Sequence, residues 1–217
     1  MLFSRFSYST KRYKPLLTSI VFCGFLSSCE SLPVEPEQVE SQVVSQDEVT
    51  IQQRQLQLAT VKSWQLDGRI SLVTDNEAWS GQLYWQQNAA SEYFIQFSAP
   101  SGQGAMQLVG SDESVELRMA NGKSYKAKDA DSLLRQETNW ELPIGGLWYW
   151  IRGLPDPELP IKMTLDQQGL IQELQQNDWH IQYQRYQQYD AYYFPRKIVI
   201  QHDDMKVRLI VTQWTVS

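Results

Sequence analysis

The chain has 217 residues, of which 42% are hydrophobic and 20% are charged, and its formal net charge is −6. This length is enough to bury the core of one domain without disulfides or metal ions. The acidic balance argues against a surface that holds nucleic acid or anionic lipid head groups by charge.

The first 28 residues have the features of an export signal. A basic cluster without acidic residues comes first, and an apolar run over 16–26 follows. This run suits the apolar region of a signal peptide and is shorter than the roughly 20 residues that a membrane-spanning helix needs. Leu26-Ser27-Ser28-Cys29 then matches a lipobox, in which the cysteine thiol takes up a diacylglyceryl group. We therefore predict a signal peptide over 1–28 and lipid attachment at Cys29.

Cleavage before Cys29 has consequences for the mature chain. Cys23 leaves with the signal, so the one remaining cysteine is acylated and disulfides, thiolate metal sites and cysteine nucleophiles are excluded. Acyl chains are then the expected membrane anchor, since each buried CH₂ contributes about 0.8 kcal/mol. Glu30 stands where an aspartate is typical of inner-membrane retention. The expected location is therefore the outer membrane, on its periplasmic side.

Residues 29–50 are predicted to be a lipidated N-terminus and a flexible tether. The segment is rich in Glu, Gln, Ser and Val and has no aromatic residue, so it cannot bury enough apolar surface to offset the cost of ordering. The stretch 51–61 favours a short helix that leads into a domain over 51–217.

From Lys62 onward, apolar residues recur at every second position, which is typical of half-buried antiparallel strands. A run over 129–135 begins with N-cap candidates and predicts a short helix. Pro143 opens a second helix with a single apolar stripe, and Gly153 ends it. The pattern predicts a mainly β fold, a long antiparallel meander with a helical insertion, with strands at 64–72, 79–86, 93–97, 106–108, 115–119, 161–165, 170–175, 179–186, 197–202 and 206–214.

The sequence carries little catalytic or metal-binding chemistry. His180 is expected on an outer strand face, and His202 precedes Asp203 and Asp204 at a turn, where adjacent side chains do not converge on one metal ion. Motifs of serine hydrolases, zinc proteases and phosphate-binding loops are absent from the sequence. We therefore expect no enzyme activity, no metal and no cofactor.

The distinctive feature is the number of tryptophans, eight in all. A buried core explains each one singly. Together they also suit a sheet that wraps around an apolar ligand under an amphipathic helix. The residues predicted to line such a cavity are Trp64, Leu83, Trp85, Phe97, Leu108, Leu147, Trp148 and Ile151.

Several blocks of the sequence, taken in order, resemble the LolB family of outer-membrane lipoprotein receptors. They are Trp64 with Gly68-Arg69-Ile70, then Gly81 to Trp85, Pro100-Ser101-Gly102-Gln103-Gly104, Leu142-Pro143 to Gly153-Leu154-Pro155, and Val207-Arg208-Leu209 with Trp214. The resemblance implies an incomplete antiparallel β-barrel, covered by short helices that enclose an apolar cavity. It implies a monomer without cofactor that takes lipoproteins by their acyl chains from a LolA-like periplasmic carrier and inserts them into the outer membrane.

The resemblance also implies a membrane-insertion loop made by Pro100, Ser101 and Gly102, with Met106 as the first bulky apolar residue after it. The family typically has a leucine directly after the proline. Ser101 occupies that position here, which puts the insertion step in doubt but not the reception of cargo.

Two other interpretations remain open at this stage. An envelope-assembly or peptidoglycan-associated lipoprotein scaffold would use the same architecture and carry no lipid cargo. A lipid-acting hydrolase would need a nucleophile and a partnered base inside the cavity, and His180 and His202 are poorly placed for that role.

Overall fold

A computed structural model describes residues 46–61, 63–89, 91–99 and 105–216 of the chain. The predicted signal peptide, Cys29, most of the predicted tether and the loop residues Pro100, Ser101 and Gly102 lie outside the described residues. Within the described part, residues from 46 onward belong to one compact unit.

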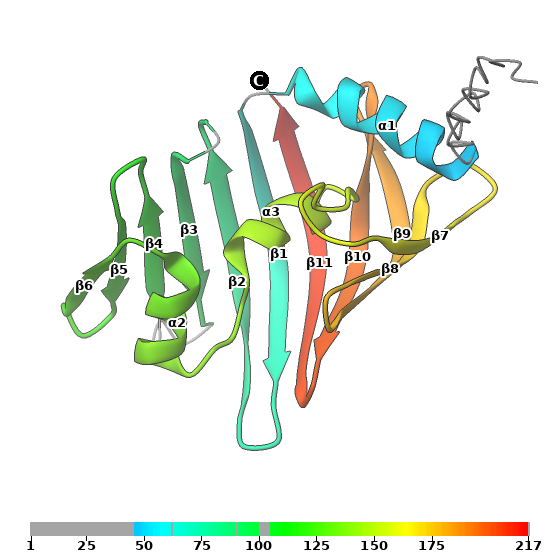
Figure 1. Ribbon diagram of the computed structural model, residues 1–217. Helices are drawn as coiled ribbons and strands as arrows, with labels where there is room; N and C mark the ends of the chain where they lie inside the picture. Colours follow the sequence, from blue (N-terminus) through cyan, green and yellow to red (C-terminus); the bar gives the residue numbers. More distant parts are fainter. Residues whose placement is uncertain (1–45, 62, 90, 100–104, 217) are drawn as a thin grey trace, which may run out of the picture. The chain divides into compact units, whose positions relative to one another are not determined.

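The strands of this unit form a single antiparallel sheet (Figure 1). The spatial order is β6-β5-β4-β3-β2-β1-β11-β10-β9-β8-β7, so two meanders meet where β1 pairs with β11. β6 and β7 are the two edges and are not paired with each other, so the barrel is incomplete, as predicted. The strands are β1 (Trp64–Val73), β2 (Ala78–Gln87), β3 (Tyr93–Ser98), β4 (Met106–Gly110), β5 (Val115–Met119), β6 (Ser124–Ala127), β7 (Lys162–Leu165), β8 (Ile171–Gln176), β9 (Trp179–Tyr189), β10 (Tyr192–His202) and β11 (Met205–Val216).

Burial alternates along the strands because one face of the sheet packs against the core. In β1, every second residue from Trp64 to Leu72 is buried, and the residues between them are more exposed. The alternation therefore located ten of the strands. It missed β6, whose sequence SYKA has no large aliphatic residue, and it began β10 five residues late. Pro195 interrupts the pattern there, and the register shifts directly after it.

Three helices accompany the sheet: α1 (Gln46–Ala59), α2 (Ala130–Thr138) and α3 (Ile144–Trp150). α2 and α3 lie over one face of the sheet (Figure 1), and α1 places Ile51 and Leu58 in the same core. The two inserted helices match the prediction, while α1 begins five residues before the predicted start. None of the described helices is long and apolar enough to cross a bilayer.

A row of aromatic rings runs across the buried face, near one end of the four central strands. Phe194 of β10 stacks on Trp214 of β11 with ring centroids 4.4 Å apart. Trp214 contacts Trp64 of β1 at 5.2 Å, and Trp64 contacts Trp85 of β2 at 5.5 Å. Such contacts contribute about 0.5–1.5 kcal/mol each beyond the area that they bury. The row fixes the position of Trp85 on β2.

Candidate functional site

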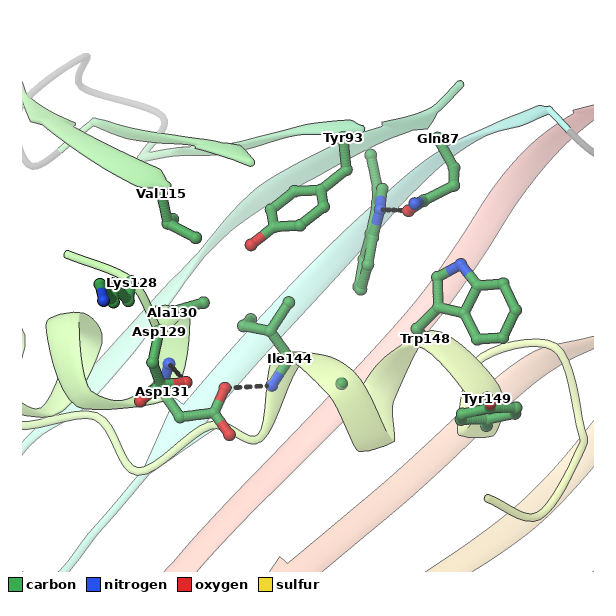
Figure 2. A pocket seen from close by; sticks show the side chains of 12 residues that line it. Gln87, Tyr93, Val115, Lys128, Asp129, Ala130, Asp131, Ile144, Trp148 and Tyr149 are labelled. Atoms are coloured by element: carbon green, nitrogen blue, oxygen red, sulfur yellow. Dashed lines mark hydrogen bonds between the residues drawn. The ribbon is translucent and has the colours of Figure 1, made fainter. Parts of the chain in front are cut away.

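A pocket of about 440 Å³ lies between strands β2, β3 and β5 and the helices α2 and α3 (Figure 2). Sites for small ligands usually have volumes of roughly 300–1,000 Å³. The wall of this pocket combines large apolar side chains with a few polar ones. The lining residues are Trp85, Gln87, Tyr93, Val115, Lys128, Asp129, Ala130, Asp131, Ile144, Gly145, Trp148 and Tyr149.

The wall formed by β2 is apolar but contains one buried amide. Trp85 is 2% exposed, and its ring rests on Trp64. The indole Nε1 of Trp85 donates to Oε1 of Gln87 at 2.9 Å, and the amide nitrogen of Gln87 donates to the carbonyl of Ala89. The amide therefore satisfies the indole and fixes the ring, so that Trp85 offers the pocket a flat apolar surface.

Two aspartates lie at the start of α2, at one side of the pocket, and one of them joins α2 to α3. Asp129 caps α2 by accepting hydrogen bonds from the backbone N–H groups of Asp131 and Ser132. Asp131 accepts from the backbone N–H of Ile144 at 2.8 Å, which supplies the cap that Pro143 cannot give to α3. Burial raises the pKa of Asp131, and the hydrogen bond from Ile144 opposes this shift only in part. The start of α3 is therefore held by α2.

Tyr93 enters the pocket from β3, and Figure 2 shows its hydroxyl directed into the space between Val115 and Ile144. Its ring lies against Gly110 of β4, where an added Cβ would come within 2.2 Å of the ring. Burial raises the pKa of Tyr93 to about 12, and the charges of Asp131 and Asp129 add to the shift. The hydroxyl is therefore neutral and protonated at neutral pH.

Trp148 enters from the opposite wall, on α3. The guanidinium carbon of Arg152 lies 3.5 Å from the centre of its ring, and the Nε of Arg152 donates to the Trp148 carbonyl at 2.9 Å. Burial lowers the pKa of Arg152 to about 10, which still leaves it charged at neutral pH. The indole Nε1 of Trp148 is buried and has no hydrogen-bond acceptor in the described part of the chain.

The C-terminal end of α3 is anchored by α1. Arg54 of α1 donates to the carbonyls of Arg152 at 3.0 Å and Gly153 at 3.3 Å, and it also binds the carbonyl of Tyr193 on β10. The hydroxyl of Tyr183 on β9 donates to the carbonyl of Trp150 at 2.9 Å. The helix that roofs the pocket is thus tied at one end to α1 and the sheet and at the other to α2.

The structure separates the residues that were predicted to line a cavity. Trp85 and Trp148 line the pocket. The other predicted residues are buried in the core and do not line the pocket, and the ring of Trp64 packs against that of Trp85. Their part in holding acyl chains stays a prediction; these core residues are Trp64, Leu83, Phe97, Leu108, Leu147 and Ile151.

Met106, the last residue of the predicted insertion loop, is the first residue of β4. It pairs opposite Phe97 and is 4% exposed, so its side chain belongs to the core and does not project into solvent. Any projecting group would have to come from the segment 100–104, which lies outside the described residues.

The polar residues of the pocket were missed from the sequence. One signal was available: Gln87 continues the inward positions of β2 after Leu83 and Trp85, and a polar residue on a buried face demands a partner. Asp131 and Tyr149 gave no such signal, because their place in the pocket depends on how α2 and α3 lie over the sheet.

The chain is similar to proteins of one family over most of its length. The family model described as "Outer membrane lipoprotein LolB" matches residues 62–214. The chain is 33% identical over 191 residues to the outer-membrane lipoprotein LolB of Pseudomonas paraeruginosa, covering 88% of this chain and 91% of the relative. It is 37% identical over 166 residues to the protein of that name in Nitrosococcus oceani, covering 76% of this chain and 82% of the relative.

Solved structures show the same fold at much lower identity. A LolA superfamily protein from Nitrosomonas europaea superposes with a TM-score of 0.51 at 8% identity, covering 77% of this chain and 93% of that one. A DUF1329 family protein from Desulfovibrio piger gives a TM-score of 0.52 at 8% identity, covering 79% and 91%. The fold is thus shared with the LolA superfamily, and the sequence match over 62–214 shows that the chain belongs to the LolB family.

Proposed function

We propose that this protein is an outer-membrane lipoprotein that accepts lipoproteins from a LolA-like periplasmic carrier and inserts them into the outer membrane. The acyl chains of the cargo would occupy the pocket beneath α3. One observation carries the proposal: in a LolB-family chain, a pocket of about 440 Å³ opens between the roofing helix and the sheet, with Trp85 and Trp148 on facing walls.

The passage of acyl chains from the carrier through this pocket to the membrane needs no chemical energy source. Each CH₂ that leaves water contributes about 0.8 kcal/mol, so a chain is held strongly by any apolar surface that covers it. Cargo moves forward when it binds more tightly here than in the carrier, and leaves when the bilayer covers the chains better still. We therefore propose a monomeric receptor that works without nucleotide or cofactor.

We further propose that the protein is not an enzyme. His202 stacks on Trp179 with centroids 4.6 Å apart, and His180 lies on β9; neither lines the pocket. The side chains that do line it offer no nucleophile paired with a base. This arrangement supports a binding role over the lipid-acting hydrolase.

The proposal keeps the domain plan suggested by the sequence: a signal peptide over 1–28, a lipidated N-terminus and tether over 29–50, and the receptor domain over 51–217. Lipid on Cys29 would hold the domain at the periplasmic side of the outer membrane. The described domain itself has no helix that could cross a bilayer.

A transfer assay tests this function directly. The mature chain without its lipid anchor is mixed with a carrier loaded with a lipoprotein, and the two proteins are separated to determine which one holds the cargo. We expect the cargo with this protein in the wild type and much less of it with Trp148→Gln. Trp179→Gln is the matched control, since Trp179 is also half-buried but lies outside the pocket.

The scaffold interpretation predicts a different outcome. In that case the cargo stays with the carrier, and the purified domain binds no acylated molecule in either form. Cargo that moves to this protein equally well in the wild type and in Trp148→Gln would leave reception intact but place it outside this pocket.

A further inference from the structure

We propose that the outer face of the sheet docks on a bilayer that contains anionic phospholipids, through a basic patch that Arg69, Lys197 and Arg208 form around Ile210. The buried residues of α1, α2 and α3 belong to the core on the opposite face, so in the described part of the chain no helix covers this one (Figure 1). The inference rests on the outer-membrane location of the LolB family and not on what the pocket holds.

The register of the strands gathers the residues of the basic patch. Arg69 of β1 and Lys197 of β10 lie on either side of Ile210 of β11, each directly opposite it. Arg208 stands two residues before Ile210 on β11, so its side chain leaves the same face of the sheet. All three cations are exposed, and Ile210 is 41% exposed at their centre. The patch is thus an apolar side chain with a cation on three sides.

The three cations have no partner among the described residues. No ion pair or hydrogen bond of the described chain uses the guanidinium groups of Arg69 and Arg208 or the ammonium group of Lys197. Elsewhere on this face, side chains satisfy one another, and Gln107 of β4 donates to Gln96 of β3 at 3.0 Å. Like charges on neighbouring strands repel each other, so an anion over the patch removes a cost that the folded chain otherwise carries.

Carboxylates are scarce on the strands, although the whole chain has a net charge of −6. Asp67 is the nearest along the chain, two residues before Arg69. Glu116 is paired with Arg118 of its own strand, and Glu173 lies on β8, separated from β11 by β9 and β10. The other acids of the described chain lie in helices, turns and connections, so the overall acidic balance does not describe this face. The cations of the strands are Arg69, Arg118, Lys126, Lys162, Arg185, Arg196, Lys197, Lys206 and Arg208.

Two of these cations border the patch. Arg185 of β9 lies opposite Lys197 and extends the positive charge across the sheet. Lys206 of β11 follows the turn that carries Asp203 and Asp204, whose charges oppose its own. The positive charge therefore spreads over β1, β11, β10 and β9 and ends at this hairpin turn.

The phosphate groups of lipids match this chemistry. A guanidinium offers a planar fork of N–H groups that binds two phosphate oxygens at once. A depression of about 490 Å³ lies beside Arg69 and Arg208 and includes Ser71 and Ser80, whose hydroxyls can donate to further phosphate oxygens. Ile210 suits the apolar boundary beneath the head groups. A member of an outer-membrane lipoprotein family has such a surface beside it, which favours a bilayer over an acidic protein as the partner.

Docking in this way orients the domain. α2, α3 and the pocket between them and the sheet lie on the opposite face, so they face the periplasm, from which a carrier arrives (Figure 1). The contact therefore belongs to the stage at which cargo is received. Exposed charges are screened by salt, so this contact breaks readily and leaves the domain free to turn when cargo is released.

Flotation with vesicles tests the patch. The mature chain, expressed without residues 1–28 and carrying Cys29→Ser so that no acyl chain contributes, is mixed with vesicles of phosphatidylcholine or of equimolar phosphatidylcholine and phosphatidylglycerol. We expect about ten- to hundredfold tighter binding to the anionic vesicles, since each cation at an anionic surface strengthens binding about fivefold. Arg69→Gln, Lys197→Gln and Arg208→Gln together should reduce this preference to less than about twofold, as should salt at about 1 M.

Two controls separate the patch from overall charge and from loss of structure. Lys123→Gln, Lys126→Gln and Lys162→Gln together remove the same charge from exposed positions near the two edges of the sheet, and this variant should keep the preference. The patch variant should unfold at the temperature of the wild type, because its substitutions are at exposed positions. It should also take cargo from a loaded carrier in solution as well as the wild type does.

A fluorescent label reports which face meets the bilayer. With Cys29→Ser the mature chain has no other cysteine, so Ile210→Cys and Gln167→Cys each take one polarity-sensitive bimane label. We expect the emission from the label at Ile210→Cys to shift to the blue with anionic vesicles. The emission from Gln167→Cys, on the exposed turn between β7 and β8, should stay unchanged.

The possible results are distinct. Equal binding to both kinds of vesicle, or a preference that the patch variant keeps, overturns the membrane contact and leaves the proposed receptor intact. A blue shift at Gln167→Cys but not at Ile210→Cys overturns it in favour of another face. A patch variant that binds vesicles normally but accepts no cargo assigns the patch to a contact with the carrier instead. A wild type that prefers anionic vesicles but accepts no cargo supports the contact and contradicts the proposed function.

Discussion

Buried polar side chains fix the parts of this molecule that surround the pocket. Gln176 on β8 is fully buried; its Oε1 accepts from the indole of Trp150 at 2.8 Å and from the backbone N–H of Asp156 at 2.9 Å. Gln87 does the same for Trp85. Each amide joins a large ring to a fixed piece of backbone, so the aromatic residues around the pocket are held by directional bonds as well as by packing.

Arg54 is the buried residue with the largest expected effect on stability. Its guanidinium satisfies three carbonyls on two different segments, and no carboxylate pairs with it among the described residues. We expect Arg54→Met to lower the free energy of unfolding by about 3 kcal/mol, because charged hydrogen bonds contribute about 1.5–3 kcal/mol each and their loss leaves buried carbonyls unpaired. Urea unfolding measures the change.

The matched control for Arg54 is Arg185→Met, which removes an arginine that is exposed on β9. Its cost should stay within about 0.5 kcal/mol, as is usual for surface positions. Arg54→Lys should recover only part of the loss, since one ammonium group cannot reproduce the planar fork of a guanidinium. Equal stability of Arg54→Met and Arg185→Met would show that the carbonyls are satisfied in another way.

The raised pKa of Asp131 predicts how the stability of the protein depends on pH. Its folded pKa is raised above the ordinary 3.8, chiefly by burial, so ionisation costs stability and this cost grows as pH rises from the unfolded pKa through the folded one. Asp131→Asn keeps an acceptor for the N–H of Ile144 but does not titrate. The stability of the variant relative to the wild type should therefore increase with pH across this window.

Urea unfolding of both proteins at several pH values tests Asp131. Asp129, Arg135 and Tyr93 face the same carboxyl, but they are present in both proteins, so their direct titration cancels in the difference. A difference in stability that is flat with pH, or that falls as pH rises, would contradict a raised pKa.

Among the helices, α3 is short, and its two ends are held by residues of other elements. Its seven residues are too few to be stable alone, so its place depends on contacts with α1, α2 and the sheet. Gly145 lies inside it, and a Cβ there would meet nothing within 4 Å. Gly153 follows it with φ of +73°, and a Cβ there would meet Tyr186 at 3.0 Å and Pro195 at 3.1 Å.

These two glycines predict opposite effects of the same substitution. Gly153→Ala should lower stability by about 1–2 kcal/mol, because it forces a side chain into the left-handed region against close neighbours. Gly145→Ala should raise stability by about 0.5–1 kcal/mol, since alanine loses less backbone freedom than glycine in a helix. Thermal unfolding of both variants gives the comparison, and a loss of stability in Gly145→Ala would mean that α3 needs the flexibility of that glycine.

The strands were predictable from the sequence because one face of each is buried and burial imposes a period of two. β6 and the start of β10 were not, since SYKA lacks large aliphatic residues and Pro195 breaks the alternation. The start of α2 and the end of α3 followed from local chemistry, with Asp129 as a cap and Gly153 as a stop, whereas the start of α1 did not. The hydrogen bond that Asp131 accepts from the backbone N–H of Ile144 crosses between two helices, and no local pattern encodes it.

At the scale of the whole molecule, the sequence could predict a large aromatic interior but not where that interior stops being core and becomes a pocket. Trp64 and Trp85 are adjacent members of one row of rings, yet only Trp85 reaches the pocket. The difference depends on the path of α3 over the sheet, which arises from Arg54, Tyr183 and Asp131 acting from three other elements.

The connection from β3 to β4 bears on the release of cargo. Ser101 stands where the resemblance to the family implies a leucine, and Met106 is buried in β4, so neither supplies a projecting apolar group. Burying a leucine fully is worth about 1.5–3 kcal/mol, and a loop tip enters a bilayer only in part. We expect Ser101→Leu to add about 1 kcal/mol to membrane contact and to speed the incorporation of cargo into liposomes several-fold, with acceptance from the carrier unchanged.

A two-stage assay that scores acceptance and incorporation separately tests the loop. Gln167→Leu places a leucine at the exposed turn between β7 and β8 and should leave both stages unchanged, so a gain there would mean that any apolar tip suffices. Met106→Ser should act through stability instead, because it removes a core side chain, and the fraction that remains folded should transfer cargo normally. If Ser101→Leu leaves incorporation unchanged, the connection is only a link between strands. Release would then depend on α3, whose opening exposes the acyl chains to the bilayer.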